Sequence, residues 1–222
     1  MTLDEIWNMT YDEYVQYLLN KYGAAQCNYF TPDWKKNPNR SRTSEGLECH
    51  HIDEDKYPLL SNEMIARQCP YKFQKADRLV YADRIEHLLL HVKLCREGHG
   101  AGWDCGVKTL IQATNEMYQT PPTSGWQLNM YNKIKDYFSV YIEILDRILT
   151  LIWQDDSVTV PDVILDVINK ESHDPDDKLK MLWSYYFSFY ILPDHSEKIE
   201  SAYFAHLDNQ ESSTTPQVFE FE

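Results

Sequence analysis

Apolar residues recur at helical spacing through the second half of this 222-residue chain. The clearest run covers 127–152, where one stripe consists of Ile134, Phe138, Tyr141, Ile142, Leu145 and Leu149. Side chains three or four positions apart share one face of a helix, so the stripe requires a helix packed against a core. Similar patterns predict helices over 107–119, 161–171, 177–191 and 197–207, followed by a polar, acidic tail over 209–222 that frays.

The first 46 residues are predicted to form a helix followed by a basic loop. Thr10 and Glu13 have the spacing of a capping box, and apolar residues continue to Gly23, so we expect a helix over 11–22. Pro, Asn, Ser and basic residues dominate 31–46, which indicates a loop. Its positive charges, with no acidic residue among them, are Lys35, Lys36, Arg40 and Arg42.

Two short β-favouring segments and a helix come next. Residues 47–52 predict a strand that ends in an acidic turn, and 79–81 predict a second strand. Between them, Ser61 is a suitable N-cap for a short helix, and Asp83 is suitable to cap a helix over 84–96. Together with the helical second half, this order predicts a mostly helical α+β fold. We divide it into a region over 1–106 and an acidic helical region over 107–222.

Composition excludes several classes of protein. Hydrophobic residues make up 43% of the chain and aromatic residues 14%, which is too much apolar surface for a disordered chain. No run approaches the ~18 apolar residues of a membrane span, and the first residues do not resemble a signal peptide, so we expect a cytoplasmic protein without a membrane partner. The five cysteines include no C-x-x-C pair, which favours reduced thiols.

The negative charge is concentrated in the C-terminal third. The formal net charge is −14, which opposes binding to a phosphate backbone. Residues 155–222 hold fifteen acidic residues and four lysines, a net charge of −11, whereas residues 35–95 hold eleven basic and nine acidic residues, a net charge of +2. The middle of the chain therefore remains compatible with nucleic acid, and the acidic region suits a basic protein partner.

Four histidines suggest a chemistry. His50 and His51 are adjacent on a predicted strand, so they point to opposite faces unless the strand bends. His87 and His91 lie one helical turn apart and can bind one ion. Metal-dependent phosphodiester hydrolysis needs a divalent ion and a general base, and imidazole suits both tasks. A zincin protease is excluded, because Leu88 rather than a glutamate follows the first helical histidine.

These segments resemble a known family. Residues 48–53, 79–81 and 86–91 are similar to HNH endonucleases of phages and mobile elements, and the His-His and His-x3-His frame resembles colicin-type DNases. The flanking segments 42–46 and 88–93 resemble HNH-like proteins of Firmicutes. The resemblance covers about 45–95. It implies a ββα-metal motif, a two-stranded hairpin plus a helix, embedded in a helical scaffold.

The resemblance also implies roles for individual residues. His50, His87 and His91 would bind one divalent metal ion (Mg, Mn, Ni or Zn), and His51 would be the general base. The family's middle asparagine falls at Arg78, just after Asp77, which is a departure from the pattern. We expect Asp77 to accept the backbone hydrogen bonds of that asparagine and Arg78 to bind phosphate, so both are candidate catalytic residues.

Two functions follow as expectations. The first is an endonuclease acting on double-stranded DNA, with the four basic loop residues contacting phosphate and the acidic region free to bind a protein partner. The second is a catalytically degenerate HNH-like protein that inhibits a nucleic-acid-binding partner, as in phage or mobile-element counter-defence of the anti-CRISPR kind. A separate zinc site from Cys95, His99 and Cys105, completed by Cys69 or Cys27, is a weaker alternative to free thiols.

Overall fold

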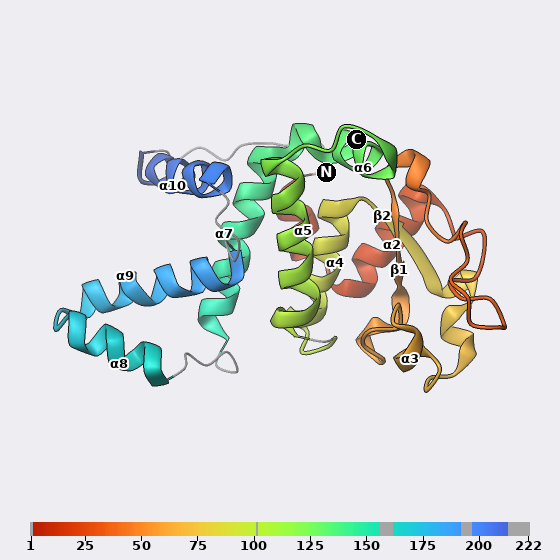
Figure 1. The fold of residues 1–222 in the computed structure, drawn as a ribbon, viewed down its shortest axis with the longest axis horizontal. Helices are drawn as coiled ribbons and strands as arrows, with labels where there is room; N and C mark the ends of the chain where they lie inside the picture. The colour runs from red at the N-terminus through yellow and green to blue at the C-terminus, as the bar shows by residue number, and fades with distance from the viewer. Residues whose placement is uncertain (1, 101, 156–161, 192–196, 213–222) are drawn as a thin grey trace.

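The computed structural model describes residues 2–100, 102–155, 162–191 and 197–212. In this part of the chain the fold is α+β and mostly helical, as predicted, with one two-stranded antiparallel sheet (Figure 1). The helices are α1 (Leu3–Asn8), α2 (Tyr11–Tyr22), α3 (Glu63–Ala66), α4 (Arg84–Arg96), α5 (Lys108–Gln119), α6 (Gly125–Ile134), α7 (Phe138–Gln154), α8 (Asp162–Glu171), α9 (Pro175–Tyr186) and α10 (Glu197–Ser212). The strands are β1 (Glu48–His51) and β2 (Leu79–Ala82).

Short helical turns connect several of these elements. The 3-10 turns are η1 (Thr43–Glu45), η2 (Ile52–Asp55), η3 (Tyr71–Gln74), η4 (Ala76–Arg78) and η6 (Lys135–Tyr137). Two further segments, η5 (Trp103–Val107) and η7 (Phe187–Ile191), are π-helical. Single π turns are rare, and those that occur are frequently at functional sites.

The predicted strand, strand, helix order is confirmed. Strands β1 and β2 pair antiparallel, with His50 opposite Val80. Helix α4 begins after Asp83, whose side chain accepts hydrogen bonds from the backbone N–H groups of Ile85 and Glu86. This cap fixes the residue at which the chain leaves the sheet and α4 begins. Helix α4 packs against both strands.

The short helix between the strands has a different cap from the predicted one. We expected Ser61 as the N-cap, but α3 begins after Asn62, whose carboxamide oxygen accepts a hydrogen bond from the N–H of Met64 at 3.0 Å. Both residue types can cap a helix, so the sequence pattern alone did not distinguish these adjacent positions.

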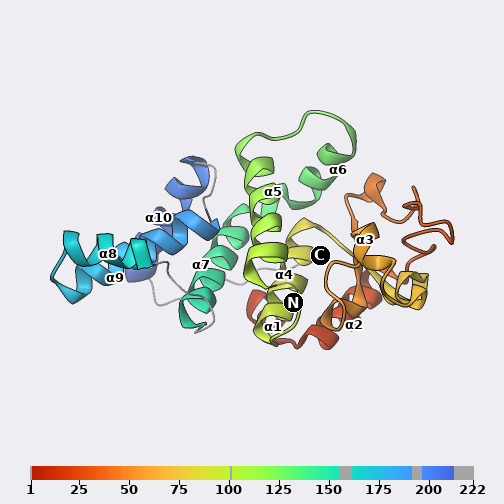
Figure 2. The ribbon, with the colours of Figure 1, turned by 60° about the horizontal axis from the view of Figure 1, so that its bottom comes forward.

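The predicted helix over 127–152 is also wrong in one respect, because it is broken into α6 and α7 at η6. In a continuous helix the carbonyl of Ile134 would accept the N–H of Phe138. Here that carbonyl accepts the hydroxyl hydrogen of Tyr118 from α5 at 2.6 Å. A tertiary contact thus competes with the helical bond, and α6 and α7 run in different directions (Figures 1 and 2).

The C-terminal helices follow the predictions with shifted ends. Helix α8 begins at Asp162, and α9 with η7 covers the predicted 177–191 and starts two residues earlier. The predicted helix over 197–207 extends as α10 to Ser212, so the expected fraying from 209 is wrong for the first four tail residues. Residues 213–222 lie outside the described residues.

Helix α4 is the centre of the main hydrophobic core. It buries Leu88, Leu89, Leu90 and Val92 on several faces, as expected of a helix covered all round, and α2, β2, α5 and α7 supply the surrounding residues. Figures 1 and 2 place α8 and α9 at the opposite end of the molecule from the β-hairpin. None of the described helices combines the length and hydropathy of a membrane span. The division at residue 106 stays a prediction.

Candidate metal centre

Three of the four predicted histidines converge on one point. Strand β1 carries His50, and successive turns of α4 carry His87 and His91. Their ring centroids are 5.0–5.2 Å apart, and one ligand nitrogen of each ring lies within 4.8 Å of the other two. The predicted convergence is confirmed, and the group can hold a metal ion.

The partner of His50 determines which of its nitrogens is free. The buried Tyr11 hydroxyl lies 2.9 Å from Nε2 of His50 and 2.9 Å from the carbonyl oxygen of Ile52. A carbonyl only accepts, so the single phenolic hydrogen goes to Ile52 and the phenol oxygen accepts Nε2–H of His50. We therefore assign an unprotonated Nδ1 to His50, which is the nitrogen able to bind a metal.

Glu48 fixes the ring of His87 in the same way. Its carboxylate lies 3.3 Å from Nδ1 of His87 and 3.2 Å from Nε of Arg84. Although burial opposes ionisation, the hydrogen bond from His87 and the charge of Arg84 hold the pKa of Glu48 below its ordinary value. An ionised carboxylate accepts Nδ1–H, which leaves Nε2 of His87 as the ligand atom.

His91 is positioned by a glycine. A Cβ atom placed on Gly106 in η5 would lie 2.3 Å from Nδ1 of His91, so no larger residue fits there without displacing the ring. Its other nitrogen, Nε2, faces the carboxyl group of Glu54 at 3.8 Å. The π turn thus brings bare backbone against the imidazole, a contact that the sequence analysis missed, because Gly106 resembled an ordinary loop glycine.

Burial keeps the imidazoles of His50 and His91 neutral. It lowers the pKa of His50 well below the ordinary value, assisted by the neighbouring His91, and it lowers the pKa of His91 to about 3, assisted by His87. Only a neutral imidazole has a lone pair for a metal. The donor set therefore fits a transition-metal ion, whose charge would offset the cost of burying polar rings in one place.

His51 lies beside the three-histidine group with its own partner. Its Nε2 is 3.0 Å from the side-chain oxygen of Gln74, while the Gln74 amide nitrogen donates to the carbonyl of Leu60 at 3.3 Å. That second bond turns the amide oxygen toward His51, so Nε2 carries the hydrogen and Nδ1 is free to accept a proton. Burial lowers the pKa of His51 to about 4. Gln74 is fully buried, and the sequence analysis missed it.

No family model, curated protein or solved structure matches this chain. The geometry of the centre is therefore the basis on which a function can be assigned.

The two other candidate catalytic residues lie away from the three-histidine group. The Arg78 guanidinium donates to both carboxylate oxygens of Asp53, at 2.6 and 2.5 Å, and thereby holds the turn that follows His51. Asp77 is exposed, and neither Asp77 nor Arg78 is among the residues that line the cavity at the centre. Direct catalytic roles for them stay a prediction, and the side chain that contacts the ring of His51 is Gln74.

One basic loop residue reaches the centre. Arg40 lines the cavity beside the histidines, and its guanidinium lies 5.3 Å from the centroid of the Tyr29 ring. The same ring lies 4.4 Å from the ring of His51. Lys36 also approaches Tyr29, at 5.9 Å. Tyr29 thus links the basic loop to the expected general base.

The remaining basic loop residues have other partners. Arg42 pairs with Glu45 and donates to the carbonyl of Tyr22 at 2.7 Å, which ties the loop to α2. Lys35 is highly exposed and pairs with Asp33 at 3.0 Å. The guanidinium of Arg40 also donates to the carbonyl of Asn37, at 3.0 Å. The four predicted nucleic-acid contacts are not equivalent, because Arg40 is the one that lines the cavity at the histidines.

The histidines open into a cavity of about 370 Å³. It is lined by Tyr29, Arg40, Ser41, Glu48, Cys49, His50, His51, Glu54, Leu59, Ser61, His87, His91, Gly106, Thr109 and Leu110. Strand β1, turn η2, helix α4 and the start of α5 all contribute to its wall.

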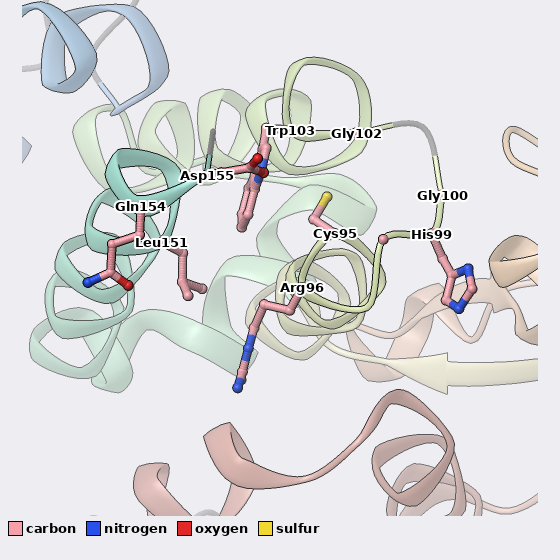
Figure 3. A pocket seen from close by; sticks show the side chains of 10 residues that line it. Cys95, Arg96, His99, Gly100, Gly102, Trp103, Leu151, Gln154 and Asp155 are labelled. Atoms are coloured by element: carbon pink, nitrogen blue, oxygen red, sulfur yellow. The ribbon is translucent and has the colours of Figure 1, made fainter. Parts of the chain in front are cut away.

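A second cavity of about 600 Å³ lies between the end of α4, the glycine-rich loop and the end of α7 (Figure 3). The Trp103 indole donates to Asp155 there at 2.8 Å, while His99 points away from the Cys95 thiol. The alternative zinc site therefore gains no support. The side chain of Cys105 lies outside the described part of the structure. Among the described residues, the three-histidine group is the only cluster that could hold a metal ion.

Proposed function

We propose that this chain is a metal-dependent endonuclease of the HNH type that hydrolyses phosphodiester bonds of DNA. The observation that carries the proposal is the meeting of His50, His87 and His91 at a hairpin and helix, with His51 beside them. This hydrolysis requires a bound metal ion and a general base, and the site offers residues suited to both.

The chain's residues divide the work as follows. His50, His87 and His91 would hold one divalent ion, which supplies positive charge for the scissile phosphate and the leaving oxygen. His51 accepts a proton from the attacking water at Nδ1, since Gln74 occupies its other nitrogen. Gln74 is in turn held by the Leu60 carbonyl, so the base keeps one tautomer and one orientation.

Arg40 is suited to bind the substrate phosphate. A guanidinium in the same cavity as the histidines can donate two parallel hydrogen bonds to phosphate oxygens. Its position over Tyr29 limits the orientations of its side chain, which reduces the entropic cost of binding.

The proposal is tested with His51→Ala. Because the base is removed while the three ligands remain, cleavage of plasmid DNA should fall by about 10²-fold or more, and metal affinity should stay within a few-fold of wild type. Plasmid nicking and calorimetric metal titration measure the two effects. The exposed His173→Ala is the matched control and should change neither. Equal losses of cleavage and metal binding would refute the separate roles of His51 and the ligands.

A second candidate is a catalytically inactive HNH-like protein that binds a basic partner and competes with nucleic acid. The observation in its favour is an exposed acidic surface far from the hairpin, formed on and between α8 and α9 by Asp162, Asp166, Glu171 and Asp174. In this case the wild type should not bind a DNA duplex at low salt with metal present. Charge reversal at Asp166 and Glu171 should then weaken association with a basic protein.

A further inference from the structure

Glu54 lies between the three-histidine group and the expected base. It follows β1 in the turn η2, and its carboxyl group is buried. One carboxyl oxygen is 3.8 Å from Nε2 of His91, and the other is 4.0 Å from Nδ1 of His51. These are the nitrogens that the other ring contacts leave available, so the carboxyl group faces the reactive side of both imidazoles.

The surrounding turn holds Glu54 in this place. The backbone N–H of Leu60 hydrogen-bonds the carboxyl group, and the carbonyl of Leu60 is held by Gln74. The preceding Leu59 has a left-handed backbone with φ 63°, a strained conformation for a branched side chain. Such strain persists only where neighbouring contacts impose it, so the loop between η2 and α3 is held in one conformation next to this carboxyl group.

The chain offers this carboxyl group little positive charge. In the described residues no lysine or arginine forms an ion pair with Glu54, and its partners are two imidazoles and one backbone amide. A buried carboxylate is costly unless it is paired with a cation or bound to a metal. The open side of the three-histidine group is where a cation would lie.

We propose that Glu54 supplies a carboxylate oxygen as the fourth protein ligand to the ion held by His50, His87 and His91. The inference rests on the metal centre of the proposed function. Neighbouring donor atoms bound to one four-coordinate zinc ion at about 2.0–2.1 Å lie roughly 3.4 Å apart, and zinc can expand to five ligands, which leaves a position for a phosphate oxygen. The 3.8 Å separation of Glu54 and His91 approaches this spacing. The Glu54 carboxyl group lies outside the set of donor atoms that are within 4.8 Å of one another, so its side chain must rotate toward His50 and His87 when the ion binds.

The donor set restricts the ion. Three imidazoles and one carboxylate suit zinc, manganese, nickel or other transition metals. Magnesium prefers an octahedral shell of oxygen atoms with several waters. This donor set therefore excludes magnesium from the four candidate ions of the sequence analysis. We therefore expect first that the wild-type chain binds zinc and does not bind magnesium.

The test is titration of the metal-free, full-length chain with zinc alone. Glu54→Gln keeps the size of the side chain and removes its charge, and it should lower zinc affinity by more than about tenfold. The matched control Glu63→Gln changes an exposed carboxylate on α3 and should leave zinc affinity unchanged. Cobalt(II) absorption of the wild type and Glu54→Gln should differ, because one ligand is replaced.

Two outcomes overturn this inference. One is a Glu54→Gln variant that folds and binds zinc as tightly as Glu63→Gln, with the same cobalt spectrum. If Glu54→Gln fails to fold, a crystal structure of the zinc-loaded wild type decides, and a Glu54 carboxylate outside bonding distance of the ion is the second. Neither outcome affects the nuclease proposal. Conversely, a wild type could bind zinc in a way that depends on Glu54 and yet cleave no DNA. That result would refute the nuclease proposal and support Glu54 as a metal ligand.

Discussion

Different neighbouring residues fix the proton positions of His50 and His51, although both rings leave Nδ1 unprotonated. Tyr11 determines this for His50, and Gln74 determines it for His51. Each partner is itself held by a backbone carbonyl, so the proton positions follow from counting donors and acceptors. In the proposed function, these adjacent residues of β1 have different tasks, one as a metal ligand and the other as a proton acceptor.

The depressed pKa of His91 predicts a pH-dependent stability. Burial and the neighbouring His87 lower this pKa to about 3, whereas the unfolded chain titrates near the ordinary value of about 6.5. The unfolded state binds more protons between these values, so this group makes the metal-free protein less stable as the pH falls below about 6.5. The loss is up to ~1.4 kcal/mol per pH unit. The destabilisation caused by His91→Asn should therefore be largest at pH 7 and smaller at pH 5.

Urea unfolding at pH 7, 6 and 5 with a chelator present measures this difference. The control is His173→Asn, which changes an exposed histidine between α8 and α9 and should change the free energy of unfolding little. A pH-independent effect of His91→Asn would show that the His91 ring is not held neutral in the folded chain.

At the scale of elements, the centre depends on how α4 meets its neighbours. Helix α4 brings two histidines to one face, β1 crosses it with a third, and η5 closes against His91 through Gly106. Gly106 does not have a left-handed backbone, so glycine is required there because a side chain would collide with the His91 ring. The packing of the π turn on α4 therefore includes a close approach of backbone to a ring of the centre.

Gly106→Ala should impair the centre with little backbone strain. The added methyl group would displace the His91 ring, so zinc affinity should fall by roughly tenfold or more in calorimetric titration. Gly23→Ala is the contrasting variant. It strains a left-handed C-cap that has open space around it, so it should lower the free energy of unfolding by about 1 kcal/mol and leave zinc affinity unchanged. Unchanged zinc binding in Gly106→Ala would contradict the proposed packing.

At the scale of the whole molecule, charge is separated between two ends. The hairpin end carries the basic loop and the histidines, while exposed acidic residues gather on α8 and α9 at the other end. A strongly acidic protein can still bind DNA if the interface is confined to the first end. The acidic end then disfavours wrapping and keeps the interface small.

A small interface predicts that DNA binding depends only weakly on salt concentration. The basic loop residues should contribute unequally to this dependence. Arg40→Gln should weaken duplex binding and reduce the log–log salt slope by about 0.9, because the variant neutralises one phosphate fewer. Lys35→Gln removes an equal charge that is already paired with Asp33 outside the cavity, and it should have a smaller effect. Fluorescence anisotropy with a short labelled duplex across a salt series measures both. Equal slopes for the two variants would mean that Arg40 does not bind phosphate.

Local pattern was sufficient for the elements that carry the histidines. The capping box at Thr10, the cap at Asp83 and the one-turn spacing of His87 and His91 act within a few residues, so the sequence predicts α2, α4 and the ligand pair directly. The sequence could not place Gln74, Tyr11, Gly106 or Glu54 around these rings. Their roles depend on contacts between segments distant in the chain, whose pairing no local periodicity encodes.

The break between α6 and α7 has the same origin. The apolar stripe over 127–152 is continuous, yet the Tyr118 hydroxyl takes the carbonyl of Ile134 and the helix divides. Likewise, the loop composition treats Lys35 and Arg40 alike, and only packing against Tyr29 places Arg40 in the cavity. Hydrogen-bond geometry and burial depend on the folded surroundings of a group, so they become definite only when the chain has closed around it.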